Sequence, residues 1–187
     1  VQEHGALLIV QTTDFDVNRE GSDTIRFVVR VRDQTTGEYV GSGVNGTIWI
    51  ENKTGYFTKA LQTNESGYFN YVFDPDCSYN NGVLNWTIGV ANDACYVDTN
   101  YTSTLTVYAQ LKNNLELPAP GAVFNVTEPV LIRFNVTTDC PAEGRVVNAS
   151  TSVELISPSG AIFSCEPVLN ETTANAGWYN CTWDSTG

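Results

Sequence analysis

Apolar and polar side chains alternate along several short segments of the chain. Over 25–32 every second residue from Ile25 to Val31 is apolar, and three of the positions between and after them are arginine. Because successive side chains of an extended strand point to opposite faces, this period of two predicts a strand with one buried face. The same alternation recurs over 84–90, 101–109 and 130–136. No segment shows the 3.6-residue apolar period of an amphipathic helix, so the chain is expected to be all-β.

Short predicted strands separated by glycine, asparagine and proline are typical of an immunoglobulin-like, Greek-key β-sandwich. The chain also repeats itself. Residues 25–27 (Ile-Arg-Phe) recur at 132–134, residues 44–47 (Val-Asn-Gly-Thr) at 147–150, and the aromatic run 67–74 at 177–184. The matches keep their order, which predicts two tandem sandwiches, at 1–109 and 110–187, each of ordinary domain size.

The second unit is expected to be incomplete. Residue 187 aligns with about residue 77 of the first unit, so counterparts of the 84–90 and 101–109 strands are missing. Two explanations remain open. The sequence is either a piece of a longer repeat array, which we favour, or a chain completed by strands from a neighbouring chain, as in β-strand addition.

Asn-x-Ser/Thr sequons are unusually frequent. With 18 asparagines and 33 Ser or Thr among 187 residues, chance would give only about 3 of them. The chain has ten, none with proline in the middle, and a densely N-glycosylated, extracellular protein is therefore expected. The predicted acceptors are Asn45, Asn52, Asn64, Asn85, Asn100, Asn125, Asn135, Asn148, Asn170 and Asn180.

Three of these acceptors test the strand assignment. Asn85, Asn135 and Asn180 lie inside predicted strands, and each falls on the face opposite the apolar side chains. A glycan cannot be buried in a core, so an inward-facing sequon would have contradicted both interpretations.

Composition narrows the class of protein further. The formal net charge of −12 disfavours nucleic acid as a partner, because no stripe of Lys and Arg is present to neutralise phosphates. The longest apolar run, residues 6–10, is too short to span a bilayer. Partners are instead expected to be neighbouring copies, further repeats of the same protein, or other cell-surface proteins.

The five cysteines favour disulfides in such a setting. In the first unit a Cys77–Cys95 bridge is expected, since these are its only cysteines. In the second unit Cys165–Cys181 is slightly favoured, while the pairing of Cys140 stays open. An odd count leaves one thiol free or bonded outside the chain. A zinc site is disfavoured, because CxxC spacing and paired histidines are both missing.

Catalytic chemistry finds little support. The single histidine, His4, leaves no Ser-His-Asp or multi-histidine arrangement. The sequence Gly-Ser-Gly-Val-Asn-Gly at 41–46 matches a phosphate-binding pattern, but a strand follows it rather than a helix. Asp14, Asp16 and Asn18 form a weak calcium candidate, because the positions that should be Gly and Glu are Arg19 and Ile25. No enzyme activity and no cofactor are expected beyond N-linked glycans.

Two cysteine- and aromatic-rich stretches carry a resemblance. The first unit has Pro75-Asp76-Cys77, Trp86 and Cys95-Tyr96; the second has Asp139-Cys140, Cys165-Glu166-Pro167 and the run 177–183. They resemble tandem immunoglobulin-like modules of large, N-glycosylated archaeal surface proteins of the surface-layer or adhesin kind. The resemblance implies an extracellular structural or adhesive part and no active site.

The expected function is thus a non-catalytic module of a cell-surface coat or repeat array. Two alternatives are a subunit of an extracellular filament completed by strand donation, and an adhesin or receptor ectodomain that binds a ligand through its loops. A coat predicts glycans nearly all round, whereas a binding module predicts one loop end or sheet face without sequons.

Overall fold

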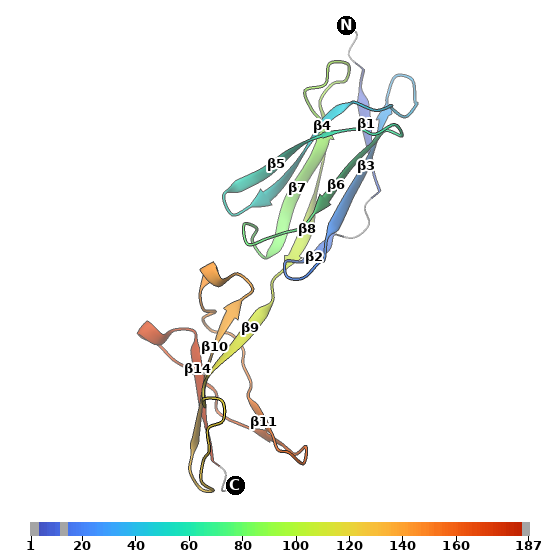
Figure 1. Ribbon diagram of the computed structural model, residues 1–187. Coiled ribbons are helices and arrows are strands. Elements are labelled where there is room, and N and C mark those ends of the chain that lie inside the picture. Colours follow the sequence, from blue (N-terminus) through green and yellow to red (C-terminus); the bar gives the residue numbers. More distant parts are fainter. Residues whose placement is uncertain (1–3, 12–14, 185–187) are drawn as a thin grey trace. The chain divides into compact units, whose positions relative to one another are not determined.

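The computed structural model describes residues 4–11 and 15–184. The chain is all-β and divides into two compact units, Val1–Ala109 and Gln110–Gly187. The first unit contains eight strands (Figure 1), listed here in chain order: β1 (Ala6–Val10), β2 (Asp16–Asn18), β3 (Ile25–Asp33), β4 (Asn45–Asn52), β5 (Gly55–Gln62), β6 (Tyr68–Phe73), β7 (Gly82–Val90) and β8 (Thr99–Tyr108).

These eight strands form two sheets of a sandwich. One sheet has the order β1-β3-β6, and the other has the order β2-β8-β7-β4-β5. The chain changes sheet between β3 and β4 and again between β5 and β6, as a Greek-key sandwich requires. All pairings are antiparallel except that of β2 with β8, which is parallel. The immunoglobulin-like sandwich expected for the first unit is confirmed.

The core of the first unit lies between the two sheets. Phe27 on β3 and Trp86 on β7 come from opposite sheets, both are fully buried, and their ring centroids lie 4.7 Å apart. Along β3 the side chains alternate between buried and partly or fully exposed, as the sequence pattern predicts. Each fully buried side chain of this size stabilises the fold by about 1.5–3 kcal/mol relative to an exposed one.

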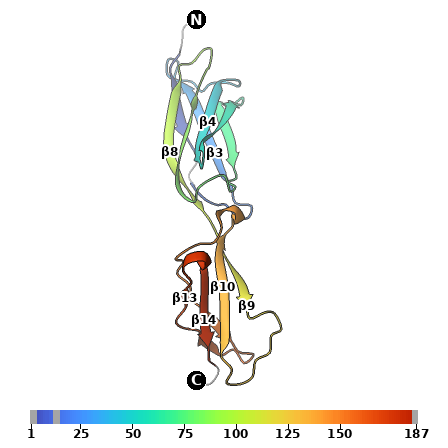
Figure 2. The same ribbon diagram turned by 90° about the vertical axis from the view of Figure 1, so that its left-hand side faces the viewer.

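The second unit has six strands and two 3₁₀ turns: β9 (Leu111–Leu117), β10 (Val130–Thr138), η1 (Pro141–Glu143), β11 (Glu154–Ile156), β12 (Ile162–Ser164), β13 (Leu169–Asn170), η2 (Thr173–Asn175) and β14 (Trp178–Trp183). Figure 2 shows β13, β14, β10 and β9 side by side in one sheet. The facing layer is reduced to the β11–β12 hairpin. The Cys165–Cys181 disulfide ties the chain after β12 to β14 and so holds the hairpin against the sheet.

The sequence repeat corresponds to a repeated strand pair. In the first unit β3 pairs antiparallel with β6, and in the second β10 pairs antiparallel with β14. Phe27 lies opposite Tyr71, whereas Phe134 lies opposite Tyr179, which the sequence match equates with Phe69. The two registers therefore differ by two residues, a shift that keeps every side chain on its face. The 147–150 match lies outside any strand, although residues 45–47 belong to β4.

The glycine that opens the repeated aromatic run has a structural reason. Gly67 and Gly177 precede β6 and β14 and have φ values of 78° and 83°. A β-carbon at Gly67 would lie 2.5 Å from the carbonyl oxygen of Val40, and one at Gly177 would lie 2.6 Å from Cβ of Arg145. Both positions thus require glycine for backbone conformation and for space.

Replacing Gly67 by alanine is expected to lower the free energy of unfolding by roughly 2–4 kcal/mol, since backbone strain and overlap each cost about 1–3 kcal/mol. Gly82→Ala is the matched control. Gly82 also has a positive φ, 102°, but nothing lies within 4 Å of its would-be β-carbon. Urea unfolding should give the control a loss of about 1–2 kcal/mol. Equal losses in the two variants would contradict the close approach at Gly67.

Candidate functional site: an outward-facing set of asparagines

The ten predicted acceptor asparagines all lie outside the two cores. None of the ten is buried. Asn45, Asn52, Asn135 and Asn180 are half-buried, and the other six are exposed. The outward orientation predicted for the strand residues Asn85, Asn135 and Asn180 is confirmed, because each lies between two buried neighbours in its strand. Whether any of the ten carries a glycan stays a prediction.

Two sequons lie side by side on the outer face of the five-stranded sheet. Asn85 and Thr87 belong to β7, and Asn100 and Thr102 belong to β8. Thr87 and Thr102 are direct cross-strand partners, and their hydroxyl oxygens are 3.0 Å apart in a hydrogen bond. The hydroxyl groups of both sequons thus meet on one face of the sheet.

The side chain of Asn85 is held by a carboxylate on the next strand. Its Nδ2 donates to Oε2 of Glu51 at 2.7 Å, and its backbone N donates to the same oxygen at 3.0 Å. These two hydrogen bonds, the backbone one first, lower the pKa of Glu51. The amide of Asn85 is therefore fixed in one orientation across the strand pair.

Two other sequons form turns. Oδ1 of Asn52 accepts hydrogen bonds from the backbone N and the hydroxyl of Thr54, its own sequon threonine. Oδ1 of Asn64 accepts from the backbone N of Ser66 and of Tyr68. Such Asx turns use the carbonyl oxygen of the asparagine. The amide nitrogen, to which a glycan would be joined, is not consumed by the turn.

In the second unit, sequon side chains bond to other side chains. Nδ2 of Asn170 donates to Oδ1 of Asn148 at 2.8 Å, so two acceptor asparagines contact each other. Oδ1 of Asn135 accepts from Asn114 on the edge strand β9. Nδ2 of Asn125 donates to Glu128 at 3.2 Å.

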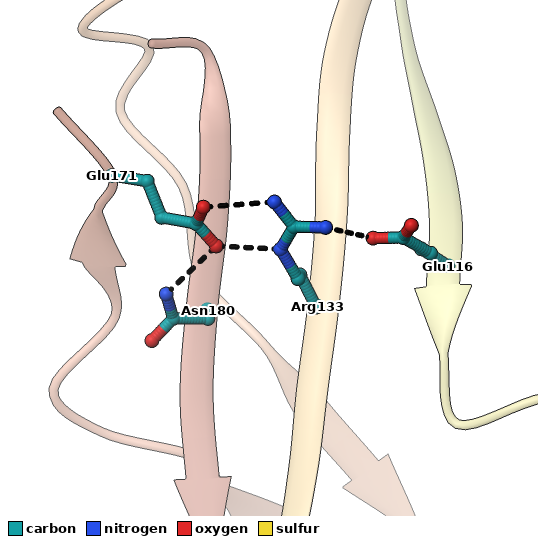
Figure 3. Close-up of polar contacts among 4 residues, drawn as sticks. All are labelled: Glu116, Arg133, Glu171 and Asn180. Atoms are coloured by element: carbon teal, nitrogen blue, oxygen red, sulfur yellow. Dashed lines mark hydrogen bonds and ion pairs between the residues drawn. The ribbon is translucent and has the colours of Figure 1, made fainter. Parts of the chain in front are cut away.

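Asn180 is part of a charged network on the outer face of the four-stranded sheet (Figure 3). Arg133 on β10 donates through Nε and Nη2 to the two carboxylate oxygens of Glu171, at 2.6 and 2.8 Å, and through Nη1 to Glu116 on β9. Nδ2 of Asn180 donates to Oε1 of Glu171 at 3.1 Å. The guanidinium carbon of Arg133 also lies 4.1 Å from the ring centroid of Trp178. The network connects β9, β10, β14 and the loop after β13.

The network perturbs its own ionisation. The bidentate hydrogen bonds from Arg133 lower the pKa of Glu171 to about 2 and, together with Glu116, raise the pKa of Arg133. The first unit has a simpler counterpart. Arg26 and Asn70, which the repeat equates with Arg133 and Asn180, bond directly through Nη2 and Oδ1 at 3.4 Å. The glutamates are thus an addition of the second unit.

The cysteines follow the prediction only in part. The Cys165–Cys181 bridge is formed, with both residues buried. The predicted Cys77–Cys95 bridge is wrong, because Cys95 carries a free, exposed thiol. Cys95 lies in a turn in which Oδ1 of Asp93 accepts its backbone N. The bracketing of a turn and a strand by two cysteines therefore did not indicate their pairing.

The weak calcium candidate gains no further ligands. Asp14 lies outside the described residues. The backbone N and Nδ2 of Asn18 both donate to Oδ2 of Asp23, which lowers the pKa of Asp23. Asn18 therefore acts as a hydrogen-bond donor within an acidic turn. Across residues 4–11 and 15–184, no group of three or more His, Cys, Asp or Glu residues is arranged to hold a metal ion.

Comparisons with known proteins do not assign a family. No protein-family model and no curated protein matches the chain. A solved structure described as a tetra-tandem repeat in the extending region of a large adhesion protein is similar over 98% of this chain, with a TM-score of 0.42 and 12% identity. This chain spans 42% of the length of that one. A likeness this distant assigns neither a family nor a function. In the described part of the chain, no helix has the length and apolar character needed to cross a membrane.

Glu171 is expected to make the second unit sensitive to acid. Its pKa of about 2 lies below the unfolded value of about 4.3, so its contribution is complete above that value and is lost as the pH falls toward 2. Glu171→Gln should therefore flatten the fall in unfolding free energy between about pH 4.5 and 2.5. Glu154→Gln, at an exposed position of β11, is the control and should keep the wild-type slope. Equal slopes for all three proteins would contradict the role of the ion pair.

Asn180 is expected to be the least glycosylated acceptor of the second unit. Its amide nitrogen is bonded to Glu171, and the middle residue of its sequon, Cys181, is buried in a disulfide. Peptide-level mass spectrometry of secreted protein should show lower occupancy at Asn180 than at the exposed Asn148. Cys165→Ser, which prevents the bridge, should raise occupancy at Asn180 selectively. Occupancy at Asn180 equal to that at Asn148 would refute this expectation.

Proposed function

We propose that the chain is a non-catalytic extracellular module whose tandem sandwiches carry N-glycans on their outer faces and form part of a cell-surface coat or repeat array. The observation that carries the proposal is the placement of ten sequons, three times the number expected by chance, at positions that are exposed or half-buried. Buried acceptors would have been incompatible with glycosylation in the folded state.

Two further properties support an extracellular location. The Cys165–Cys181 disulfide is typical of an oxidising compartment. The sequons also occur in both units, on strands as well as in turns, as expected for a coat rather than for a protein with one bare ligand face. The resemblance to archaeal surface-layer or adhesin modules belongs to the same proposal.

Glycan attachment follows known chemistry. An activated, lipid-linked glycosyl phosphate supplies the sugar, C1 of which forms a bond to Nδ2 of the asparagine. The phosphate leaves, and Nδ2 gives up one of its two hydrogens. The remaining N–H can still donate a hydrogen bond, so a glycan on Asn85 is compatible with the Glu51 contact.

A second candidate function, an extracellular filament subunit that accepts a strand from a neighbour, is favoured by one observation. Strand β9 lies at the edge of its sheet. Leu115 is paired with the buried Phe134 and so shares its core-side face, yet Leu115 is 62% exposed and Leu111 is 61% exposed. An unpaired edge with apolar side chains is the kind of surface to which a further strand adds.

Intact-mass measurement separates these possibilities from a protein without glycans. The chain should be secreted from a glycosylating host with and without an inhibitor of N-glycosylation. We expect the untreated protein to exceed the polypeptide mass by several glycans and to remain monomeric. A secreted protein with the bare polypeptide mass would overturn the proposal, whereas glycosylated protein that forms concentration-dependent oligomers would favour the filament.

A further inference from the structure

The outer face of the five-stranded sheet contains a small hollow beside one acceptor asparagine. Trp49, Tyr56, Thr87 and Asn100 line it, and its volume is about 230 Å³. Trp49 is half-buried in the middle of β4, between Thr58 and Thr87 on the neighbouring strands. This tryptophan thus faces away from the core, among threonines.

Gly89 creates the space for the asparagine. Gly89 on β7 lies directly opposite Asn100 on β8. A β-carbon at Gly89 would lie 2.2 Å from Oδ1 of Asn100 and 2.3 Å from the carbonyl oxygen of Thr99. The φ of Gly89 is outside the left-handed region, so the glycine is needed for space and not for conformation. The side chain of Asn100 therefore lies across β7, on the side of the hollow.

We propose that the first sugar ring of a glycan on Asn100 packs into this hollow against the indole of Trp49, with Tyr56 at the far side. This inference rests on the proposed function, since it requires that Asn100 be glycosylated. A pyranose presents one face of C–H groups and keeps its hydroxyls at the edge. Aromatic side chains offer the flat apolar surface that such a face covers. The glycan of Asn100 would then be part of the packing of the sheet.

The size of the hollow agrees with one sugar. Sites for drug-sized ligands measure about 300–1,000 Å³, and this hollow is smaller than that. The sequon threonine is also fixed, because Thr102 is hydrogen-bonded to Thr87 on the floor of the same region. A single ring joined to Asn100 is therefore the occupant that the geometry fits, in preference to a free oligosaccharide.

Asn45 provides a matched comparison on the same sheet. It lines a larger hollow, of about 520 Å³, whose walls contain no aromatic ring. Its Oδ1 accepts a hydrogen bond from Gln62 at 3.1 Å. A glycan on Asn45 would lie on the same face of the protein without an indole to cover.

A double-mutant cycle tests the contact. The full chain is secreted from a glycosylating host, and an endoglycosidase trims every glycan to its first N-acetylglucosamine. We expect Asn100→Gln to lower Tm by about 3–8 °C when Trp49 is present, and by less than half as much in the Trp49→Thr background. Threonine is chosen because it suits a strand and matches the neighbours of Trp49. Asn45→Gln should shift Tm equally in both backgrounds.

Unglycosylated protein from a host without N-glycosylation completes the design. There Asn100→Gln and Trp49→Thr should be additive, because no sugar connects the two positions. Additive effects in the glycosylated protein, with Asn100 occupied by peptide mass, would overturn the inference and leave the proposed function intact. A bare Asn100 would also overturn it, and bare asparagines at all ten sequons would overturn the proposed function with it.

Discussion

The structure depends on burying one face of each sheet and exposing the other. A sandwich of this kind forms a core only if apolar side chains recur at every second position, as they do along β3, β7 and β10. The same constraint assigns each remaining position to the outer face. An asparagine between two buried residues, such as Asn85 between Leu84 and Trp86, is therefore directed outward by the packing of its neighbours. The fold and the positions available for glycans follow from one pattern.

The two units satisfy this constraint to different extents. In the first unit a three-stranded and a five-stranded sheet enclose the core. In the second unit a hairpin covers the four-stranded sheet, and a disulfide and the Arg133 network add cross-links on its inner and outer faces. A smaller facing layer buries less apolar surface, and covalent and ionic links compensate for it. The free edge of β9, with its exposed leucines, belongs to the same incomplete layer.

Much of the fold could be predicted from the sequence, because alternation is a local signal. The strands around Phe27, Trp86 and Phe134 and the outward direction of Asn180 follow from it directly. The Cys77–Cys95 pairing could not be predicted, since a pairing depends on which loops meet in space. The contact of Arg133 with Glu171 joins residues 38 positions apart, and the repeat offers no hint of it, because Arg26 bonds to Asn70 instead. The hollow at Trp49 likewise requires Gly89 and Asn100 on adjacent strands. Only the exposed-face position of Trp49, two residues from Thr47 and Glu51, could have drawn attention to it.

Site-by-site mapping of glycan attachment tests the central claim most directly. Enzymatic removal of glycans in heavy-oxygen water marks each occupied asparagine by a fixed mass increase, so every sequon of the secreted chain is scored in one experiment. The account predicts marks in both units, at turn positions such as Asn64 and at outer-face strand positions such as Asn100. Unmarked asparagines throughout a folded, secreted chain would contradict it, and the outer faces would then have to serve another purpose.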